Sequence, residues 1–393
     1  MMREKLKDIE RQLALCIKCK KCTYGDWPDN LPMCPPYNKF GFYTYCGGGM
    51  LYLGRAILLN LIEPSPEALE VISKCTMCGF CGEICELVKV TPPHLPVHEL
   101  INIIKAELIE QGIDISKRGK AVFDSIKKEK NPFGVSYDKR LKAHETFLNP
   151  KAKVMIFSGC FNTLKRKNTL DPTLRILEKA QVDFRLLGDE WCCGAPLLDM
   201  GYRKEIAELA EHNIKEIVNT RVEKVVFLCP HCLSIFSSFY PQITTAKISA
   251  ELTYVTQFIL DLARKNIVKF SNSSKPHKKV AFHDPCYLAR YIGDVQSVRE
   301  LLKCIPSVEL VEMKRNRNET YCCGAGGGVK ISDPDYAEWI GKERLKEFID
   351  TGASELITSC PHCVEHFWDV SGEMGFDFPV RDSLEIILEY ISK

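Results

Sequence analysis

The 393-residue sequence lacks any long apolar run. A membrane-spanning helix needs about 18 consecutive apolar residues, and the best stretch here, residues 56–62 (AILLNLI), is far shorter. The first residues, MMREKLKDIERQLALC, mix charged and apolar side chains and contain no apolar signal core. We therefore expect a cytoplasmic protein with no transmembrane segment of its own; attachment to the inner face of the membrane through a partner stays open.

The sequence also lacks a charge imbalance. It has 53 basic and 51 acidic side chains, a formal net charge of +2, which argues against nucleic acid or a membrane surface as a partner. With 45% hydrophobic and 26% charged residues the composition is ordinary, and the length suits two or three domains. Cysteine departs from this pattern, with 20 residues. In a reducing compartment such a number favours metal ligands or redox sites over disulfides.

Two runs of cysteines lie in the first hundred residues. Cysteines at two-residue gaps are typical of ligands to [4Fe–4S] cubanes, and in two-cluster ferredoxins the fourth cysteine of each run ligates the other cluster. This crossover predicts one cubane from the first run and the end of the second, Cys16, Cys19, Cys22 and Cys85. It predicts another from the second run and the end of the first, Cys75, Cys78, Cys81 and Cys34.

The first run is irregular. Its gap from Cys22 to Cys34 holds 11 residues, and Cys46 competes with Cys34 as the fourth ligand. We prefer Cys34 because Pro35 follows it, although Glu86 follows Cys85 in the second run. Zinc is the alternative metal, but it usually takes paired CxxC units, and each triple run would leave one thiolate over.

The first 150 residues are expected to form a helical ferredoxin-type domain. Apolar spacing and capping residues predict helices over residues 1–15, 47–62, 66–74, 96–112 and 116–129. Asn149-Pro150 marks the end of this domain.

From about residue 152 the chain repeats itself. Each copy reads strand, helix, strand, CCG loop, helix, strand and Pro-His-Cys, and then ends in a helix. Such alternation predicts parallel α/β units, with the polar stretch 271–279 as the linker. The fold class is therefore α+β multidomain: the helical domain, then tandem α/β domains over 151–270 and 278–393.

Each copy carries five cysteines, all at strand ends or in the loops beyond them. That edge of a parallel sheet is where ligands bind. The first set is Cys160, Cys192, Cys193, Cys229 and Cys232. The second set is Cys286, Cys322, Cys323, Cys360 and Cys363.

This doubled pattern resembles the cysteine-rich CCG domains of heterodisulfide reductases, and with the two CxxCxxC runs it is similar to their D-type subunit over nearly the whole chain. The resemblance implies that each five-cysteine set holds a non-cubane [4Fe–4S] cluster, with all ten cysteines as catalytic residues. It also implies an archaeal enzyme of methanogenesis that reduces the coenzyme M–coenzyme B heterodisulfide. Electrons would arrive through the two cubanes from a membrane cytochrome b or a flavoprotein.

The alternative function is an electron-transfer subunit that links a flavin dehydrogenase of the lactate or glycolate type to a quinone-linked membrane partner. Relatives of that kind often have an incomplete five-cysteine set, so two intact sets favour disulfide reduction. One departure concerns the loop after Cys286, where Tyr287 and Ala289 replace a histidine and a glycine common in relatives.

Several other residues are candidates for supporting roles. His231 and His362, inside the Cys-Pro-His-Cys loops, either donate protons or form hydrogen bonds to sulfur or backbone. Arg290 is the preferred contact for an anionic substrate group; the other basic candidates are Lys165, Arg166, Lys167, Lys314, Arg315 and Arg317. His283 with Asp284 is expected to orient a loop, and Cys46 and Cys304 are expected to be structural.

The two CCG loops differ in stiffness. The first continues with Ala195-Pro196, whereas the second continues through Gly326 to Gly328. Glycine permits close backbone approach and a wider range of conformations. We therefore expect the second loop to be the more adaptable one, and its site to be the one that binds substrate.

Overall fold

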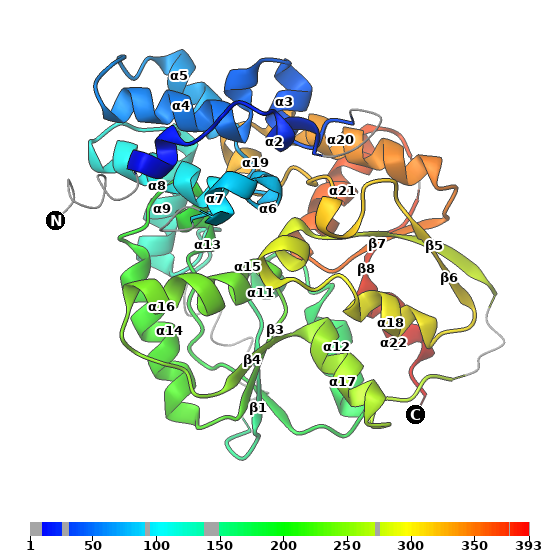
Figure 1. The fold of residues 1–393 in the computed structure, drawn as a ribbon. Coiled ribbons are helices and arrows are strands. Elements are labelled where there is room, and N and C mark those ends of the chain that lie inside the picture. Colours follow the sequence, from blue (N-terminus) through cyan, green and yellow to red (C-terminus); the bar gives the residue numbers. More distant parts are fainter. Residues whose placement is uncertain are drawn as a thin grey trace.

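The computed structural model describes residues 10–25, 31–90, 95–136, 149–271, 276–376 and 378–392. A helical region comes first, and two four-stranded sheets follow it; the blue and cyan helices lie at the top left of Figure 1, above the green helices of the first α/β unit. Among the described helices, none combines the length and hydropathy of a membrane span.

The helical region follows the predicted pattern closely. Its helices are α2 (Lys21–Tyr24), α3 (Pro35–Phe40), η1 (Tyr43–Tyr45), α4 (Gly47–Leu58), α5 (Pro66–Ser73), α6 (Phe80–Ile84), α7 (Glu86–Val90), α8 (Val97–Glu110) and α9 (Lys117–Glu129). The Ser65 side chain caps α5 by accepting a hydrogen bond from the Ala68 N–H. Helix α4 ends at Leu58, four residues earlier than expected. Residues 10–14 are helical, and residues 1–9 of the first expected helix lie outside the described part.

The first sheet contains β1 (Val154–Phe157), β2 (Phe184–Leu186), β3 (Lys224–Phe227) and β4 (Glu251–Tyr254). All its pairs are parallel, in the order β2-β1-β3-β4. Its helices are α11 (Cys160–Leu164), α12 (Leu170–Lys179), α13 (Ala195–Met200), α14 (Ile206–Thr220), α15 (Pro230–Ser234), the π-helix η3 (Ile235–Phe239), α16 (Tyr240–Ile243) and α17 (Val255–Arg264).

The second sheet repeats this plan with β5 (Lys278–His283), β6 (Val308–Glu312), β7 (Glu355–Thr358) and β8 (Val380–Asp382). It is parallel throughout, in the matching order β6-β5-β7-β8. Its helices are η4 (Tyr287–Ile292), α18 (Ser297–Lys303), η5 (Arg317–Glu319), α19 (Val329–Ser332), α20 (Pro334–Asp350), α21 (Pro361–Glu373) and α22 (Ser383–Tyr390). The two tandem α/β units expected from the repeat are thus present.

Each unit contains more elements than the sequence pattern predicts. Each sheet has a fourth strand, β4 or β8, which leads at once into the closing helix. Residues 380–382 form a strand rather than the first turn of that helix. The helices that follow Cys229 and Cys360 were not predicted either, because the cysteines interrupt the apolar spacing from which a helix is recognised.

The two halves share one apolar core and exchange contacts crosswise. Buried residues of both sheets, among them Phe157 and Phe282, belong to the same cluster. Helix α17 packs on α18, and α22 packs on α12. The Tyr254 hydroxyl donates to the carbonyl of Ser359, and in the other direction Thr169 donates to Asp382 over 2.7 Å. These contacts hold the two halves together with their cysteine loops facing each other.

Candidate functional site

The first set of cysteines gathers beyond β1 and β3. Cys160 begins α11 just after β1, and Cys229 caps α15 just after β3. Cys192 contacts the thiols of Cys160 and Cys193, and Cys193 also contacts Cys232. All five are buried, and none of the chain's 20 cysteines forms a disulfide. The structure thus brings the five predicted residues of this set together.

The second set repeats this geometry beyond β5 and β7. The Sγ atoms of Cys323 and Cys363 lie 3.3 Å apart. Cys322 contacts Cys286 and Cys323, and Cys360 contacts Cys363. All five are again buried.

The two sets meet at Cys229 and Cys360, whose thiols are in hydrogen-bonding contact. His231 and His362 lie at the same junction, and their rings are 5.2 Å apart. Each ring also contacts the residue after the first cysteine of the opposite set: His362 is tilted against Phe161 at 4.5 Å, and His231 stacks on Tyr287 at 3.7 Å. Both halves therefore build the junction in the same way, and Tyr287 contributes an aromatic ring to it as Phe161 does in the first half.

A cavity of about 390 Å³ opens beside the first set. Its walls are mainly apolar, from residues such as Phe133, Phe161 and Pro196, and both junction histidines line it. The sulfur-bearing residues in its wall are Cys160, Cys193, Cys229 and Cys232. No cysteine of the second set lines this cavity, although Ala325, Gly326 and Gly328 of the second loop do. Which of the two loops is the more adaptable stays a prediction.

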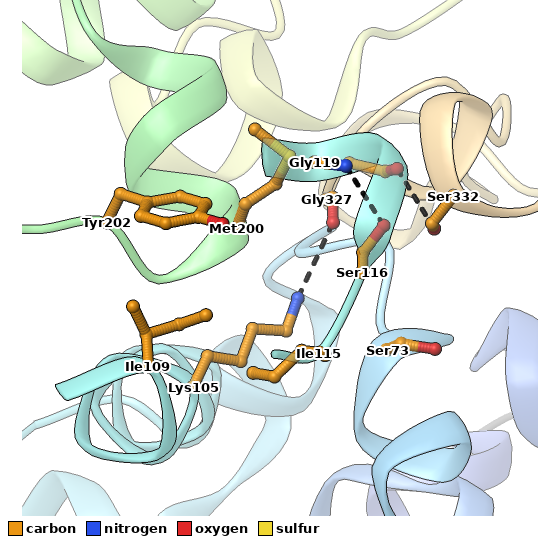
Figure 2. A pocket seen from close by; sticks show the side chains of 11 residues that line it. Ser73, Lys105, Ile109, Ile115, Ser116, Gly119, Met200, Tyr202, Gly327 and Ser332 are labelled. Carbon is orange, nitrogen blue, oxygen red and sulfur yellow. Dashed lines mark hydrogen bonds between the residues drawn. The ribbon is translucent and has the colours of Figure 1, made fainter. Parts of the chain in front are cut away.

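The glycine-rich loop of the second half, Gly326 to Gly328, also packs against the helical region. Gly327 has φ +67°, and a Cβ there would overlap the carbonyl of Cys75. Lys105 of α8 reaches the same loop and donates to the carbonyls of Gly327 and Asp199 (Figure 2). The Thr76 hydroxyl contacts the Cys322 thiol. Close backbone approach to this region explains the glycines.

Arg290 belongs to this same contact. Its guanidinium donates to the carbonyls of Cys78, Asn318 and Thr320 and lies 5.3 Å from the Phe80 ring. It does not line the 390 Å³ cavity, and a role for Arg290 as an anion contact stays a prediction. Lys165 does line it, and so does Lys330.

The N-terminal cysteines line two further cavities. One is bordered by Cys16, Cys19, Cys22 and Cys85. The other is bordered by Cys34, Cys75, Cys78 and Cys81, with Cys22 between the two. Cys46 is buried with its Sγ 3.6 Å from that of Cys22, and Cys304 is exposed on α18, away from both sets. Each predicted group of four thus surrounds one space.

Hydrogen bonds within each set favour the thiolate at particular cysteines and the thiol at the cysteines that donate to them. The thiols of Cys192 and Cys232 lower the pKa of Cys193 to about 6, and contacts from Cys286 and Cys323 lower the pKa of Cys322. The donors, such as Cys232 and Cys286, have a raised pKa. Burial alone lowers the pKa of a histidine, but contact with Cys229 outweighs it and raises the pKa of His231. Thiolates are the form that binds metal.

Unpaired polar atoms also point to bound groups. In the described part of the chain, His98 Nδ1, His231 Nδ1, His283 Nε2 and His366 Nδ1 are buried without a hydrogen-bonding partner. Buried polar groups are normally satisfied, and the rings of His98 and His231 line cysteine-bordered cavities. Sulfur ligands around iron would supply acceptors, so the donor set and its surroundings fit iron–sulfur clusters.

Three further residues of the site were not expected from the sequence. Asp199 accepts hydrogen bonds from the Tyr287 hydroxyl at 2.6 Å and the Gly327 N–H at 3.0 Å. Glu190 accepts from Ser158 and Gly159, and Arg344 donates to His283. All three are buried charged residues. Nothing in the spacing of a single carboxylate or guanidinium reveals such burial.

Comparison with known proteins agrees with this architecture. The cysteine-rich domain family, CCG, matches residues 154–237 and 280–367. A hypothetical protein from Helicobacter pylori has a similar fold, with a TM-score of 0.61 and 13% identity; the match covers 100% of this chain and 76% of that chain. The fold and the cysteine sets therefore define a protein with two CCG domains.

Sequence relatives narrow the class. The D-type subunit of the dihydromethanophenazine:CoB–CoM heterodisulfide reductase of Methanosarcina barkeri is 30% identical over 96% of this chain and 94% of its own length. The B-type subunit of the fumarate reductase (CoM/CoB) of Methanothermobacter marburgensis is 25% identical, over 96% of this chain and 72% of its own length. The chain belongs to the family of heterodisulfide reductase D-type subunits, which are iron–sulfur oxidoreductase proteins.

Proposed function

We propose that this chain is the catalytic iron–sulfur subunit of a reductase that cleaves the coenzyme M–coenzyme B heterodisulfide into two thiols. The observation that carries this proposal is the cavity of about 390 Å³ with four cysteines of one set and two histidines in its wall. The cluster of the first set would take up part of this space, but the cavity is far larger than those at the two N-terminal groups, about 20 and 40 Å³, which leaves room for a small molecule. A subunit that only carried electrons would have no need of an apolar cavity at its buried sulfurs.

Each group of cysteines is assigned one cluster. The two five-cysteine sets hold non-cubane [4Fe–4S] clusters, and the two N-terminal groups hold cubanes, with Cys34 rather than Cys46 as the fourth ligand. The space bordered by Cys34, Cys75, Cys78 and Cys81 supports that choice. When bound, these clusters supply single electrons and iron sites for sulfur.

The chain's own residues position the substrate and its protons. Cleavage of a disulfide consumes two electrons and two protons and yields two thiols. The apolar wall excludes water from the sulfur atoms, and His231 and His362 face the same space from opposite halves. These two histidines hold protons for the departing thiolates.

Lys165 binds an anionic end of the substrate. Within the described ranges it makes a cation–π contact with Phe133 at 5.2 Å and forms no ion pair, so its charge is available at the cavity. Arg166, its neighbour, is already paired with Glu365. An extended, negatively charged disulfide would place its charge at Lys165 and its sulfurs at the first set.

The electrons come from a partner protein, a membrane cytochrome b or a flavoprotein. Cys34, Cys75, Cys78 and Cys81 would hold the cubane beside the glycine-rich loop, which would supply electrons to the second set, and the Cys229–Cys360 contact would connect the second set with the first. The contacts of Thr76, Arg290 and Lys105 with the second half support this direction.

One experiment separates this function from its alternatives. Anaerobically purified protein with four clusters should contain about 16 irons per chain and should reduce the heterodisulfide with a strong one-electron donor. Full iron content without reduction would favour the electron-transfer role, in which the chain links a flavin dehydrogenase to a quinone-linked partner. Zinc in place of iron would contradict both functions.

A further inference from the structure

His283 ends β5, three residues before Cys286, and its side chain is fully buried. Its Nδ1 accepts a hydrogen bond of 3.0 Å from the Nε of Arg344. A guanidinium can only donate, so Nδ1 carries no proton. The ring proton therefore lies on Nε2.

That Nε2–H has no partner among the described residues of the protein. A ring nitrogen of His283 and the Sγ atoms of Cys323 and Cys363 all lie within 4.8 Å of one another. Because Nδ1 is taken by Arg344, Nε2–H is the group available to the sulfurs. A protonated nitrogen has no lone pair for a metal, so His283 is a hydrogen-bond donor rather than a sixth ligand.

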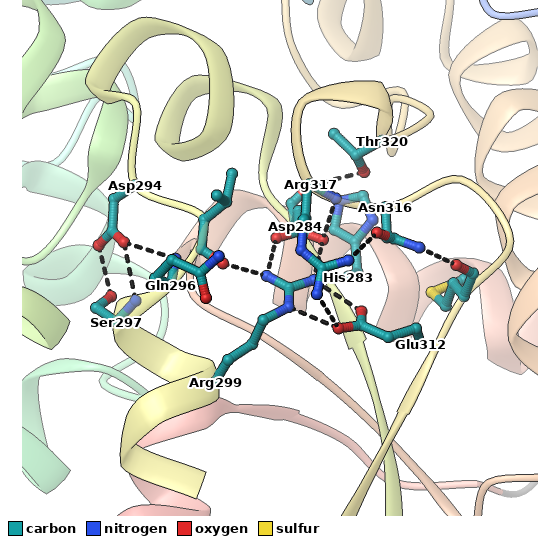
Figure 3. Close-up of polar contacts among 12 residues, drawn as sticks. His283, Asp284, Asp294, Gln296, Ser297, Arg299, Glu312, Asn316, Arg317 and Thr320 are labelled. Atoms are coloured by element: carbon teal, nitrogen blue, oxygen red, sulfur yellow. Dashed lines mark hydrogen bonds and ion pairs between the residues drawn. The ribbon is translucent and has the colours of Figure 1, made fainter. Parts of the chain in front are cut away.

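The ring is fixed on several sides. The Thr358 hydroxyl donates to the His283 carbonyl at 3.0 Å, and Phe367 meets the ring edge-on at 4.8 Å. Arg344 is itself fully buried and bonded to Glu347 at 2.6 Å. Figure 3 shows His283 beside the buried pair of Asp284 and Arg299. The orientation of the ring is therefore set by the fold, and a cation lies directly behind it.

The first half has a different arrangement at the matching place. Phe157 pairs with Phe227 in the first sheet as His283 pairs with Thr358 in the second, so a phenylalanine stands where the second half has the imidazole. Instead the buried Glu190 accepts hydrogen bonds from the Ser158 N–H at 2.8 Å and the Gly159 N–H at 2.9 Å. One set is thus backed by a cation and a donor, and the other by a carboxylate.

We propose that His283, held by Arg344, donates an N–H···S hydrogen bond to the cysteine sulfurs of the second set and thereby raises the reduction potential of that centre. Hydrogen bonds to sulfur and nearby positive charge stabilise the more negative, reduced state. The inference rests on the proposed presence of a cluster at the second set. His283 is a positioning residue that makes the second set easier to reduce than it would be without this hydrogen bond.

The test compares two substitutions in the full protein. His283→Phe removes the donor and keeps a ring, whereas His283→Gln keeps both a donor for sulfur and an acceptor for Arg344. Iron content and the midpoint potential of each centre are measured by redox titration followed by electron paramagnetic resonance. We expect His283→Phe to keep its iron and to lower the reduction equilibrium constant of one centre about tenfold, which is about 59 mV for a one-electron couple, and His283→Gln to restore it.

Several outcomes would overturn the inference. If His283→Phe keeps its full iron content and its midpoint potential is unchanged, His283 is not a donor to the sulfurs. If both variants lose iron, His283 is a ligand or a residue needed for folding. If His283→Phe does not fold, ¹⁵N-histidine labelling of the unsubstituted protein decides, because the second centre must show a nitrogen coupling beyond that of the junction histidines. If Cys323→Ala loses no iron, the second set holds no cluster, and this result would contradict the proposed function instead.

Discussion

The two CCG halves have the same strand order and the same five-cysteine geometry, yet their surroundings differ. Four cysteines of the first set border the 390 Å³ cavity, whereas the loop of the second set packs against Cys75 and Thr76 of the helical region and contributes only backbone-proximal residues such as Gly326 and Gly328 to that cavity. The charges differ as well, with Glu190 beside the first set and Arg344 behind the second. The two copies of the duplicated unit thus differ in what packs on them, and under the proposed function the first half faces the substrate and the second faces the source of electrons.

The largest effect is expected from removing matched cysteines. Cys193→Ala and Cys323→Ala should each abolish turnover and each lose about four of the irons, because each removes a ligand from one five-cysteine set. Iron analysis and activity assays check this. Cys304→Ala, at an exposed thiol outside both sets, is the control and should change neither quantity.

The crosswise contacts offer a pH-dependent test of the difference between the halves. Tyr254 and Asp382 occupy matching positions at the ends of β4 and β8. Burial raises the pKa of Asp382 from 3.8 to about 7. The folded state therefore favours the protonated acid, so its stabilising contribution is complete below about pH 4 and is lost as the pH rises through about 7.

Asp382→Asn should remove this dependence. Between pH 5 and pH 8 the unsubstituted protein should lose on the order of 2–4 kcal/mol relative to the variant, seen as a falling difference in Tm. Parallel Tm curves for the two proteins would contradict the buried, protonated state of Asp382.

The close approach of the glycine-rich loop can be tested with two matched glycines. Gly327 and Gly352 both have positive φ, but only Gly327 has neighbours within reach of a Cβ. Gly327→Ala should therefore cost about 2 kcal/mol more than Gly352→Ala and should slow reduction of the second set by a one-electron donor. Equal Tm shifts for both variants would show that the loop and the Cys75 carbonyl are not in contact.

The smallest effect is expected at the cavity mouth. Lys165→Met should raise KM for the anionic disulfide about tenfold, equivalent to about 1.4 kcal/mol, with kcat unchanged, because only binding loses an ionic contact. Lys167→Met, two residues along and outside the cavity wall, is the control. A change in kcat alone would argue against the anion contact.

Much of this arrangement could be predicted from the sequence because it repeats. The strands and cysteines of the two copies have matching order and nearly matching spacing, so the convergence of each five-cysteine set follows from parallel strands. The contact between Gly327 and Cys75 could not be predicted, since 251 residues separate them along the chain and glycine alone does not reveal what approaches it. Strand β8 was hidden because Val380–Asp382 runs directly into an amphipathic helix. The hydrogen bonds of Arg290 to the carbonyls of Cys78, Asn318 and Thr320 could not be predicted either, because a position beside a cysteine loop does not reveal which side of the loop a side chain faces.

The division of roles between the halves is tested most directly by adding a thiol coenzyme to the two cysteine variants. The oxidised proteins are mixed with ³³S-labelled thiol, and the sulfur coupling to the paramagnetic centre is measured. Cys323→Ala should retain a thiol-coupled signal, because the first set and its cavity are intact, and Cys193→Ala should lose it. A signal that persists in Cys193→Ala and vanishes in Cys323→Ala would contradict the assignment of the substrate to the first half.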